Sequence, residues 1–283
     1  MLTEVQAGLL TVRGRSLGGM YTGLHVPQLN LLFDAGTALR TGASAKRLFL
    51  SHGHVDHLGG LPALLGMRGL IGIKTPLKIY LPVELVDDLK SGLESFSAMH
   101  RWDFDVELIG MKPGEELQVE RDLYVRTFRT LHPVPSLGFL FLRRIQKLRP
   151  EFLDLPGPEI GRRRKAGEDL FTELERIELA YATDTLPEVL DQNPILFEAS
   201  TLIIECTFLD ERKSIENARL GCHIHLDELE AYFDRFQNDH IILMHFSQMY
   251  APDEVHEILK RRCPEALHRR IQPLAPTGAL WWD

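Results

Sequence analysis

The sequence predicts a single α/β domain, and three observations support this fold class. Short apolar runs alternate along the chain with stretches in which apolar residues recur at helical spacing. Hydrophobic residues make up 44% of the chain and charged residues 25%, as is typical of a globular protein with a packed core. No internal repeat or low-complexity tract divides the 283 residues, and single α/β domains of this length are common. We therefore expect one domain over residues 1–283.

Nine apolar or alternating runs predict β-strands, since most of them end at Gly, Pro or His. These runs are residues 29–34, 47–50, 77–81, 105–109, 124–129, 138–142, 179–183, 202–205 and 241–244. Helical spacing is found in residues 61–71, 83–100, 186–192, 226–236 and 251–262. Two of these helices have a clear start, because proline and acidic residues occupy the first turn at Pro187 and Glu188, and at Pro252 and Asp253.

The segment 143–167 interrupts this pattern, since it is rich in Arg, Pro and Gly and has little periodicity. We expect it to be a loop or arm inserted into the domain. Between residues 143 and 165 there are eight basic residues and three acidic ones, whereas the whole chain has a net charge of −8. A polyanionic partner could bind this segment while the body repels it. A solvated basic loop without a partner fits the same residues.

The protein is expected to be cytoplasmic and to have no membrane segment. Its cysteines, Cys206, Cys222 and Cys263, are odd in number and widely spaced, so they predict neither a disulfide framework nor a metal-binding Cys-X-X-Cys pair. The N-terminus lacks a basic region followed by an apolar core, and no stretch approaches the roughly 18 apolar residues of a membrane helix.

A cluster of metal-binding residue types follows the apolar run 48–50. Three imidazoles and one carboxylate stand within six positions, namely His52, His54, Asp56 and His57. Imidazole nitrogens and carboxylate oxygens are the usual ligands of zinc, and manganese suits an overlapping set of donors. Four donors on one short loop are too crowded for one tetrahedral ion, which favours two ions about 3.5–4 Å apart.

Three further donors stand at strand ends. His132, Asp184 and His245 follow the predicted strands 124–129, 179–183 and 241–244. Taken singly, such an Asp is usually a turn residue and such a His a surface residue. Strands of one sheet can deliver all three to a single edge, so together we expect them to join the cluster at His52.

The pattern His-X-His-X-Asp-His, followed by His132, Asp184 and His245, resembles the metallo-β-lactamase superfamily. Within it, the chain is most similar to the ribonuclease Z (tRNase Z) family in its short, plant-type form. The segments that carry the resemblance are LFLSHGHVDHLGGLPALL (48–65), HPVPSLGF (132–139), TDT (183–185), ECTFL (205–209), GCHIHLDEL (221–229) and LMHFSQMY (243–250). The resemblance implies an αββα four-layer sandwich with a dinuclear metal site at one edge. It also implies an endoribonuclease that removes the 3′ trailer of precursor tRNA and leaves a 3′-hydroxyl end.

Carried over position by position, the resemblance implies two zinc ions per subunit, with manganese as an alternative. One ion would be held by His52, His54 and His132, the other by Asp56, His57 and His245, and Asp184 would bridge them. Asp56 would also orient the attacking water. Asp34 would fix a ligand imidazole, or serve only as a turn carboxylate.

His223 falls where the family has a histidine that donates a proton to the leaving alkoxide, a role that needs a group titrating near neutral pH. Glu205 is positioned like the acidic partner of that histidine. The segment departs from the family's Gly-His-Ser-Thr form, since Cys222 precedes the histidine and His225 follows it. His225 is the alternative proton donor, and a structural role for both histidines is the third possibility.

The segment 143–167 also has a counterpart in this family. Residues 152–158 and 161–168 resemble the family's tRNA-binding arm, which implies that Arg162, Arg163, Arg164 and Lys165 contact RNA phosphates. The family works as a homodimer in which the arm of one subunit presents tRNA to the other. Two departures stand out: Val55 replaces a glycine of the metal cluster, and Met249 replaces an arginine often found after the last ligand.

Two other functions fit the same residues. The site could serve a metal-dependent phosphodiesterase or ester hydrolase that acts on a small molecule. A non-catalytic RNA-binding subunit is the second alternative, although all seven ligand positions are filled.

Overall fold

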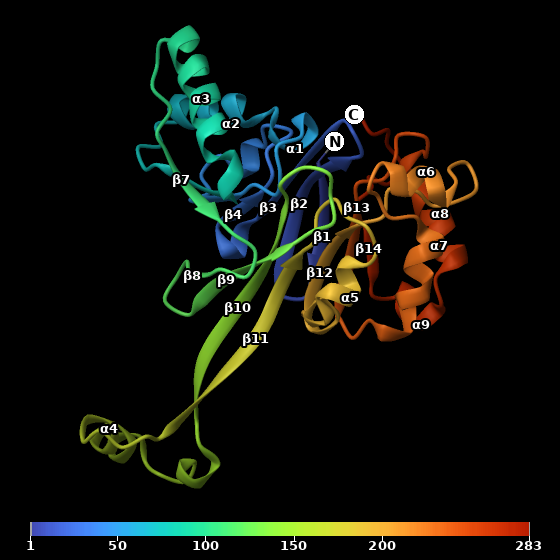
Figure 1. Ribbon diagram of the computed structural model, residues 1–283. Helices are drawn as coiled ribbons and strands as arrows, with labels where there is room; N and C mark the ends of the chain where they lie inside the picture. The colour runs from blue at the N-terminus through green and yellow to red at the C-terminus, as the bar shows by residue number, and fades with distance from the viewer. Residues whose placement is uncertain (1, 283) are drawn as a thin grey trace.

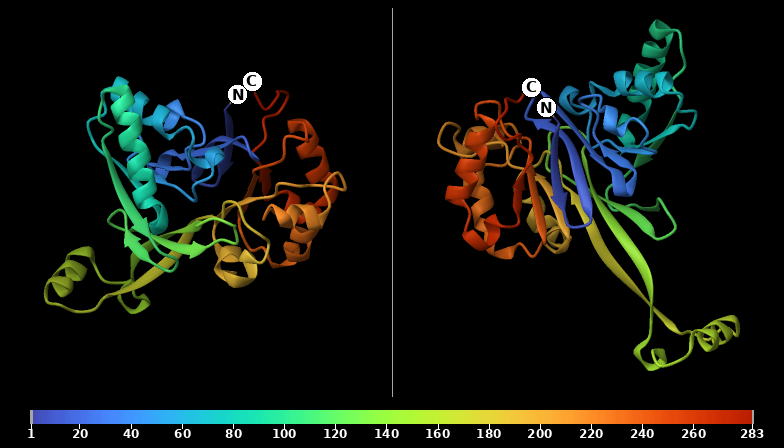
Figure 2. Two further views of the ribbon diagram at one scale, coloured as in Figure 1. Left: turned by 45° about the horizontal axis from the view of Figure 1, so that its top comes forward. Right: turned by 180° about the vertical axis from the view of Figure 1, so that it is seen from behind.

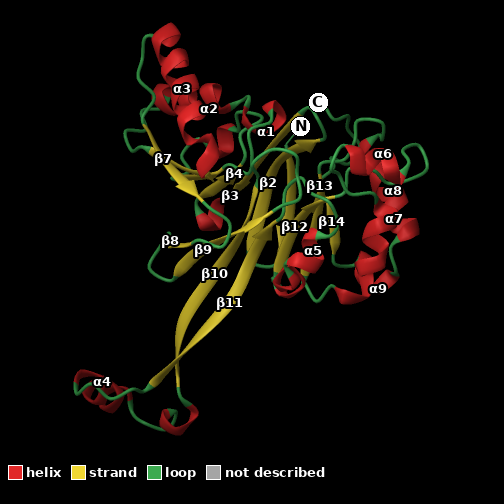
Figure 3. Ribbon diagram, in the orientation of Figure 1, coloured by secondary structure: helices red, strands yellow, loops and turns green. Residues whose placement is uncertain are grey.

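The computed structural model describes residues 2–282, and its centre consists of two seven-stranded sheets packed face to face (Figures 1 and 3). The strands of each sheet follow one another in chain order. The first sheet contains β1 (Thr3–Ala7), β2 (Leu10–Leu17), β3 (Tyr21–Val26), β4 (Leu31–Phe33), β5 (Arg47–Phe49), β6 (Leu77–Pro82) and β7 (Val106–Met111). The second contains β8 (Glu116–Gln118), β9 (Leu123–Arg129), β10 (Leu137–Leu148), β11 (Phe171–Tyr181), β12 (Thr201–Glu205), β13 (His240–Met244) and β14 (Ile271–Pro273).

The core between the sheets is aromatic. Phe33 of β4 stacks on Tyr181 of β11 with ring centroids 4.3 Å apart, and Phe49 of β5 meets Phe141 of β10 edge-on at 4.9 Å. Side chains alternate between the two faces of a strand, so Leu48 next to Phe49 points the other way and packs in a separate cluster. Burial on both faces explains why these strands read as continuous apolar runs in the sequence.

Helices cover the outer face of each sheet and complete the predicted αββα sandwich, which is confirmed. The helices beside the first sheet are α1 (Val55–Leu58), α2 (Leu61–Leu70) and α3 (Val86–His100). Those beside the second are α5 (Val189–Gln192), α6 (Ile215–Leu220), α7 (Leu226–Leu229), α8 (Pro252–Arg262) and α9 (Glu265–His268). Leu61 and Leu64 of α2 share a buried cluster with Ile79 of β6, and Leu259 of α8 shares another with Leu243 of β13.

Parallel pairing brings several strand ends to one edge of the sandwich. β4, β5 and β6 run parallel in the first sheet, as do β11, β12 and β13 in the second. β9 has the same direction as β11, because each pairs antiparallel with β10. A backbone hydrogen bond of 3.0 Å from Leu137 to the carbonyl of Ser51 ties the two sheets together at this edge.

The segment 143–167 projects from the body as an arm, and most of it is not a loop (Figures 1 and 2). β10 and β11 continue far beyond the core and stay paired up to Leu148 and Phe171. At the tip lie a short 3-10 helix (Pro150–Phe152) and α4 (Gly157–Lys165). Hydrophobic periodicity missed these elements because both faces of the arm meet solvent, and cross-strand ion pairs such as Arg143 with Glu178 stabilise it instead of a core.

Several other elements differ from the expected ones. The strands β1, β2, β3, β8 and β14 and the helices α1, α6 and α9 had not been predicted. Of these, β8 and β14 have only three residues each. The predicted helix 226–236 is α7 followed by a 3-10 helix (Glu230–Arg235), and the predicted helix 186–192 is helical only from Val189. None of the helices between residues 2 and 282 has both the length and the apolar composition of a membrane span.

Candidate metal centre and active site

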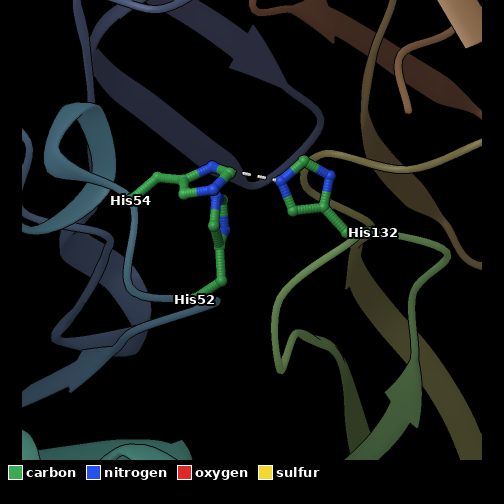
Figure 4. Close-up of side chains that lie close together, drawn as sticks. All are labelled: His52, His54 and His132. Carbon is green, nitrogen blue, oxygen red and sulfur yellow. Dashed lines mark hydrogen bonds between the residues drawn. The ribbon is translucent and has the colours of Figure 1, made fainter. Parts of the chain in front are cut away.

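The first group of donors is formed by the loop after β5 and the end of β9. His52, His54 and His132 lie with one ring nitrogen each within 4.8 Å of one another (Figure 4). Nε2 of His132 is 3.2 Å from Nδ1 of His54. Nε2 of His52 is buried and has no hydrogen-bond partner in the described part of the chain. Three imidazole nitrogens that converge in this way are arranged as the ligands of one cation.

The second group adjoins the first. Asp56, His57, Asp184 and His245 bring their donor atoms within 4.8 Å of one another. Oδ2 of Asp184 is 3.3 Å from Nε2 of His57 and 3.4 Å from Nε2 of His245, and 3.9 Å from Nε2 of His52 in the first group. Oδ1 of Asp184 is buried and has no partner among residues 2–282. Asp184 therefore stands between the groups, with one oxygen for a further ligand bond.

The protonation states of His52, His132 and Asp56 suit divalent cations. Burial lowers the pKa of His52 to about 2 and of His132 to about 4, so both imidazoles are neutral and keep a lone pair. Burial raises the pKa of Asp56, but its hydrogen bond to His245 and the nearby His57 outweigh this and bring the pKa to about 2. Neutral imidazoles and ionised carboxylates are the forms that bind metal, and the fold with these clusters fits a dinuclear site.

Asp34 holds the imidazoles in place. Its Oδ2 accepts hydrogen bonds from Nδ1 of His57 (2.8 Å), the Ser51 hydroxyl (2.9 Å) and the Tyr181 hydroxyl (2.5 Å), and its Oδ1 accepts from the Ser51 amide (2.7 Å). Because the Ser51 hydroxyl donates to Asp34, it accepts from Nδ1 of His52 at 2.9 Å. Nε2 of both His52 and His57 is thereby left free for a metal. Of the two roles considered for Asp34, the geometry favours fixing an imidazole.

The backbone is strained at this edge. Asp34, Thr183, Cys222 and His245 have positive φ angles of 54°, 21°, 57° and 60°. Such conformations cost non-glycine residues about 1–3 kcal/mol each and tend to cluster at functional sites. Gly36 allows a close approach of a different kind, since a Cβ there would lie 1.7 Å from the carbonyl oxygen of Asp56. The loops are thus bent tightly around the donor atoms.

His223 lies beside both groups of donors. Its ring centroid is 5.9 Å from that of His132 and 5.1 Å from that of His245. Nδ1 of His223 is 3.0 Å from Oε1 of Glu205, which is completely buried. Burial lowers the pKa of His223, but the Glu205 carboxylate raises it more, and the balance is a pKa of about 9. A histidine that faces the metal groups in its protonated form is arranged to donate a proton.

Comparison with known proteins identifies the family. The model of the β-lactamase superfamily domain matches residues 23–246. The tRNase Z TRZ1 of Arabidopsis thaliana is 33% identical over 262 residues, which is 92% of this chain and 93% of the relative. The chain belongs to the tRNase Z family.

Other tRNase Z proteins agree with this placement. The chloroplastic tRNase Z TRZ2 of Arabidopsis thaliana is 34% identical over 87% of this chain and 70% of its own length. The short form of human tRNase Z has a crystal structure that superimposes with a TM-score of 0.54 and 19% identity, covering 88% of this chain and 93% of that one. At that identity the superposition supports the fold, whereas the curated relatives support the family.

Glu205 is not available as a ligand, although it forms a third group of donors with His223 and His245. Its oxygens accept from the amides of Thr185 (2.9 Å) and Ile224 (3.1 Å) and from the Thr207 hydroxyl (2.5 Å). That hydroxyl donates to Glu205, so it accepts from Nδ1 of His245 at 3.1 Å and leaves Nε2 of His245 for a metal. Neither Thr207 nor Ser51 nor Tyr181 had been predicted, because hydroxyl residues have no distinctive spacing.

His225 has a structural role that accounts for both of its nitrogens. Nδ1 accepts the amide hydrogen of Asp227 at 3.1 Å and so caps α7, while Nε2 donates to the carbonyl of Asp210 at 3.0 Å. The side chain is 1% exposed. Of the two candidate proton donors, His223 is the one that the structure brings to the donor groups.

The basic residues of the tRNase Z arm lie at its tip, away from the donor groups (Figure 1). Arg162 and Arg163 both pair with Glu159, Arg163 also pairs with Glu168, and Arg164 lies over the ring of Phe171. The tip is therefore a compact element whose guanidinium groups are partly neutralised by neighbours.

The two departures from the tRNase Z pattern lie at the surface. Val55 is the first residue of α1 and its side chain is 80% exposed, so it replaces glycine without a clash. Met249 is 39% exposed, and its carbonyl oxygen is 3.4 Å from the guanidinium group of Arg212.

Proposed function

We propose that this protein is an endoribonuclease that removes the 3′ trailer of precursor tRNA, leaving a 3′-hydroxyl end. The single observation that carries the proposal is the meeting of two donor groups with the His223 and Glu205 pair at one edge of the fold, in a member of the tRNase Z family. A metal-dependent hydrolase of phosphodiesters uses cations near the phosphate and an acid near the leaving oxygen, and this edge has donor groups for the cations and a histidine for the acid.

The proposed ligand set divides along the two groups. His52, His54 and His132 would hold one ion, Asp56, His57 and His245 would hold the other, and Asp184 would lie between them as a shared ligand. Support comes from the unpartnered buried atoms of His52 and Asp184 and from the tautomers that Asp34 and Thr207 impose. The five imidazoles favour zinc, and manganese is the alternative. When bound, such ions polarise a phosphate ester and bring the pKa of water toward neutrality.

Asp56 is proposed to orient the attacking water, and His223 is proposed to donate a proton to the leaving oxygen. Asp56 accepts a hydrogen bond from the Gly19 amide at 3.1 Å and lies 3.4 Å from Nε2 of His245, so its carboxylate is fixed where it can orient the attacking water. His223 gives its proton to the 3′ oxygen of the tRNA as the phosphodiester breaks. Glu205 keeps that imidazole oriented and protonated through the 3.0 Å hydrogen bond.

The arm is proposed to bind the substrate. Arg162, Arg163, Arg164 and Lys165 contact tRNA phosphates, and the chain works as a homodimer in which the arm of one subunit serves the site of the other. The support is the distance of the tip from the donor groups within one chain (Figure 1). Sedimentation of the protein with and without precursor tRNA measures the oligomeric state, and a strictly monomeric active enzyme would contradict the dimer.

Cleavage of a radiolabelled precursor tRNA by the zinc-loaded protein tests the function. A cut at the trailer junction, abolished by His52→Ala and by removal of metal with a chelator, supports the proposal. Hydrolysis of bis(p-nitrophenyl) phosphate with intact precursor tRNA would favour the small-molecule hydrolase instead. Binding of precursor tRNA without cleavage of either substrate would favour the non-catalytic RNA-binding subunit.

The cytoplasm is the proposed compartment. Relatives carry the names chloroplastic tRNase Z and nuclear ribonuclease Z, so the family is distributed over several compartments. Fractionation of cells that express the tagged chain would decide the question, and an organellar or nuclear location would contradict it.

A further inference from the structure

The chain between Glu205 and His223 forms one excursion from the sheet, and it carries two residues that the proposed mechanism does not use. The chain leaves β12 at Glu205 and returns at His223, which bonds the same Glu205. Phe208 lies near the start of this excursion, and its ring is 6.3 Å from that of His223 in an edge-to-face arrangement. Lys213 lies just before α6, and its ammonium nitrogen is 5.2 Å from the centre of the Phe208 ring.

Lys213 differs from the other cations of this region. Arg212 pairs with Asp210 and Glu254, and Arg219 pairs with two glutamates in the same way. In residues 2–282, no carboxylate oxygen lies within ion-pair distance of the Lys213 ammonium, which rests only on the Phe208 ring. The ammonium is thus a positive charge without an ion-pair partner among the described residues, and it shares the Phe208 ring as a neighbour with the His223 imidazole.

We infer that Lys213, seated on Phe208, binds a phosphate of the retained tRNA strand next to the scissile bond. This inference rests on the proposed function. His223 marks the side of the site where the leaving oxygen lies, and that oxygen belongs to the tRNA and not to the trailer. Lys213 and His223 both lie against the Phe208 ring, which places the ammonium near the strand whose 3′ oxygen His223 protonates. A lysine over an aromatic ring is a pairing that suits single-stranded RNA, because the ring contacts bases and the ammonium contacts phosphates.

The charge of the chain makes such a contact valuable. The net charge of the chain is −8, which repels a polyanionic substrate. The basic tip of the arm lies far from this edge (Figure 1). A positive charge beside His223 would therefore position the strand at the site itself, in addition to the contacts that the arm of the other subunit makes. Lys213 is a positioning residue, since it touches the substrate away from the reacting atoms.

The test is steady-state cleavage of precursor tRNA by the full-length, zinc-loaded protein at several salt concentrations. Lys213→Met is expected to raise KM about three- to tenfold with kcat within twofold, and to reduce the slope of log KM against log salt by about 0.7 to 0.9. Lys213→Arg should restore most of the affinity. Lys260→Met, the same change at an exposed position on α8, should leave KM and the slope unchanged.

The trailer length decides which strand is bound. With a precursor whose trailer is one nucleotide, the KM effect of Lys213→Met should persist in full, because the retained strand is unchanged. Loss of the effect on this substrate, an unchanged salt slope, or equal effects of Lys213→Met and Lys260→Met would each overturn the inference. Failure of the wild-type protein to cut any precursor tRNA would instead overturn the proposed function, so the two failures are distinguishable.

Discussion

Replacement of His223 by alanine tests proton donation separately from metal binding. The 3′ alkoxide of tRNA is a strongly basic leaving group, so its departure needs a proton in the transition state. General acid catalysis contributes about 10²- to 10⁴-fold to a rate, and His223→Ala is expected to lower kcat on precursor tRNA by that factor, or about 3–5 kcal/mol. In a precursor with a bridging sulfur in place of the 3′ oxygen, the sulfur departs as a thiolate and needs no proton. With this precursor, His223→Ala should lower kcat by less than about tenfold.

The structure indicates that the variant folds and keeps its donor groups. Removal of the imidazole takes one hydrogen bond from Glu205, which retains those from the amides of Thr185 and Ile224 and from the hydroxyl of Thr207. One charge-assisted hydrogen bond is worth about 1.5–3 kcal/mol, which a domain with an extensive core tolerates. His223 is not one of the proposed metal ligands, so the variant should bind as much metal as the wild type.

The assay is single-turnover cleavage of the oxygen and sulfur precursors by both proteins, with metal content and thermal unfolding measured on the same samples. His268→Ala, a change of the same kind on α9, is the matched control and should cleave both precursors at the wild-type rate. An equal loss on both precursors would refute proton donation, because a merely structural histidine does not distinguish the leaving atoms. Near-normal cleavage of the oxygen precursor would refute any part for His223 in the reaction.

Three further predictions follow from neighbouring groups. Asp34→Asn removes the negative charge and one of the two acceptor oxygens that fix His57 and Ser51, and is expected to weaken metal affinity about 10- to 100-fold, measured by competition with a chelator; unchanged affinity would contradict the role of Asp34. Glu205→Gln removes the carboxylate that raises the pKa of His223. Burial, which lowers this pKa, is then no longer opposed, so the pKa should fall. The protonated form, present below the pKa and lost above it, then disappears at a lower pH, so the alkaline limb of the kcat/KM profile should move down, and a limb that stays in place would count against the pair. Replacement of residues 150–168 by a short glycine and serine turn should raise KM for precursor tRNA and reduce its salt dependence, while turnover of bis(p-nitrophenyl) phosphate stays unchanged; an unaltered KM would exclude the arm from binding.

The convergence of the donor residues could be read from the sequence because of where they stand. His132, Asp184 and His245 each follow an apolar strand, and the structure places those strand ends at one edge with the loop of His52. Because these strands run in the same direction, donors that are far apart in the sequence could be predicted to lie close together. The assignment of each donor to one of two ions remains a prediction that metal-bound crystals can test.

The residues that hold these donors could not be read in the same way. Ser51, Tyr181 and Thr207 are ordinary residue types, and their roles arise from hydrogen bonds to residues that lie elsewhere in the sequence. Tyr181, for example, lies 147 positions from the Asp34 that it bonds. The paired strands of the arm were missed for a related reason, because a ribbon without a core has no hydrophobic period.

The strained backbone links the fold to the proposed chemistry. Asp34 and His245 have positive φ angles, and the first orients one metal-facing imidazole while the second is itself a donor. Each conformation costs about 1–3 kcal/mol, and the aromatic core beneath them, with Phe33 directly before Asp34, offsets that cost. A rigid sandwich can hold its loops in conformations that a flexible loop would abandon. The donors are then pre-organised before any cation binds, and binding energy is not spent on ordering the site.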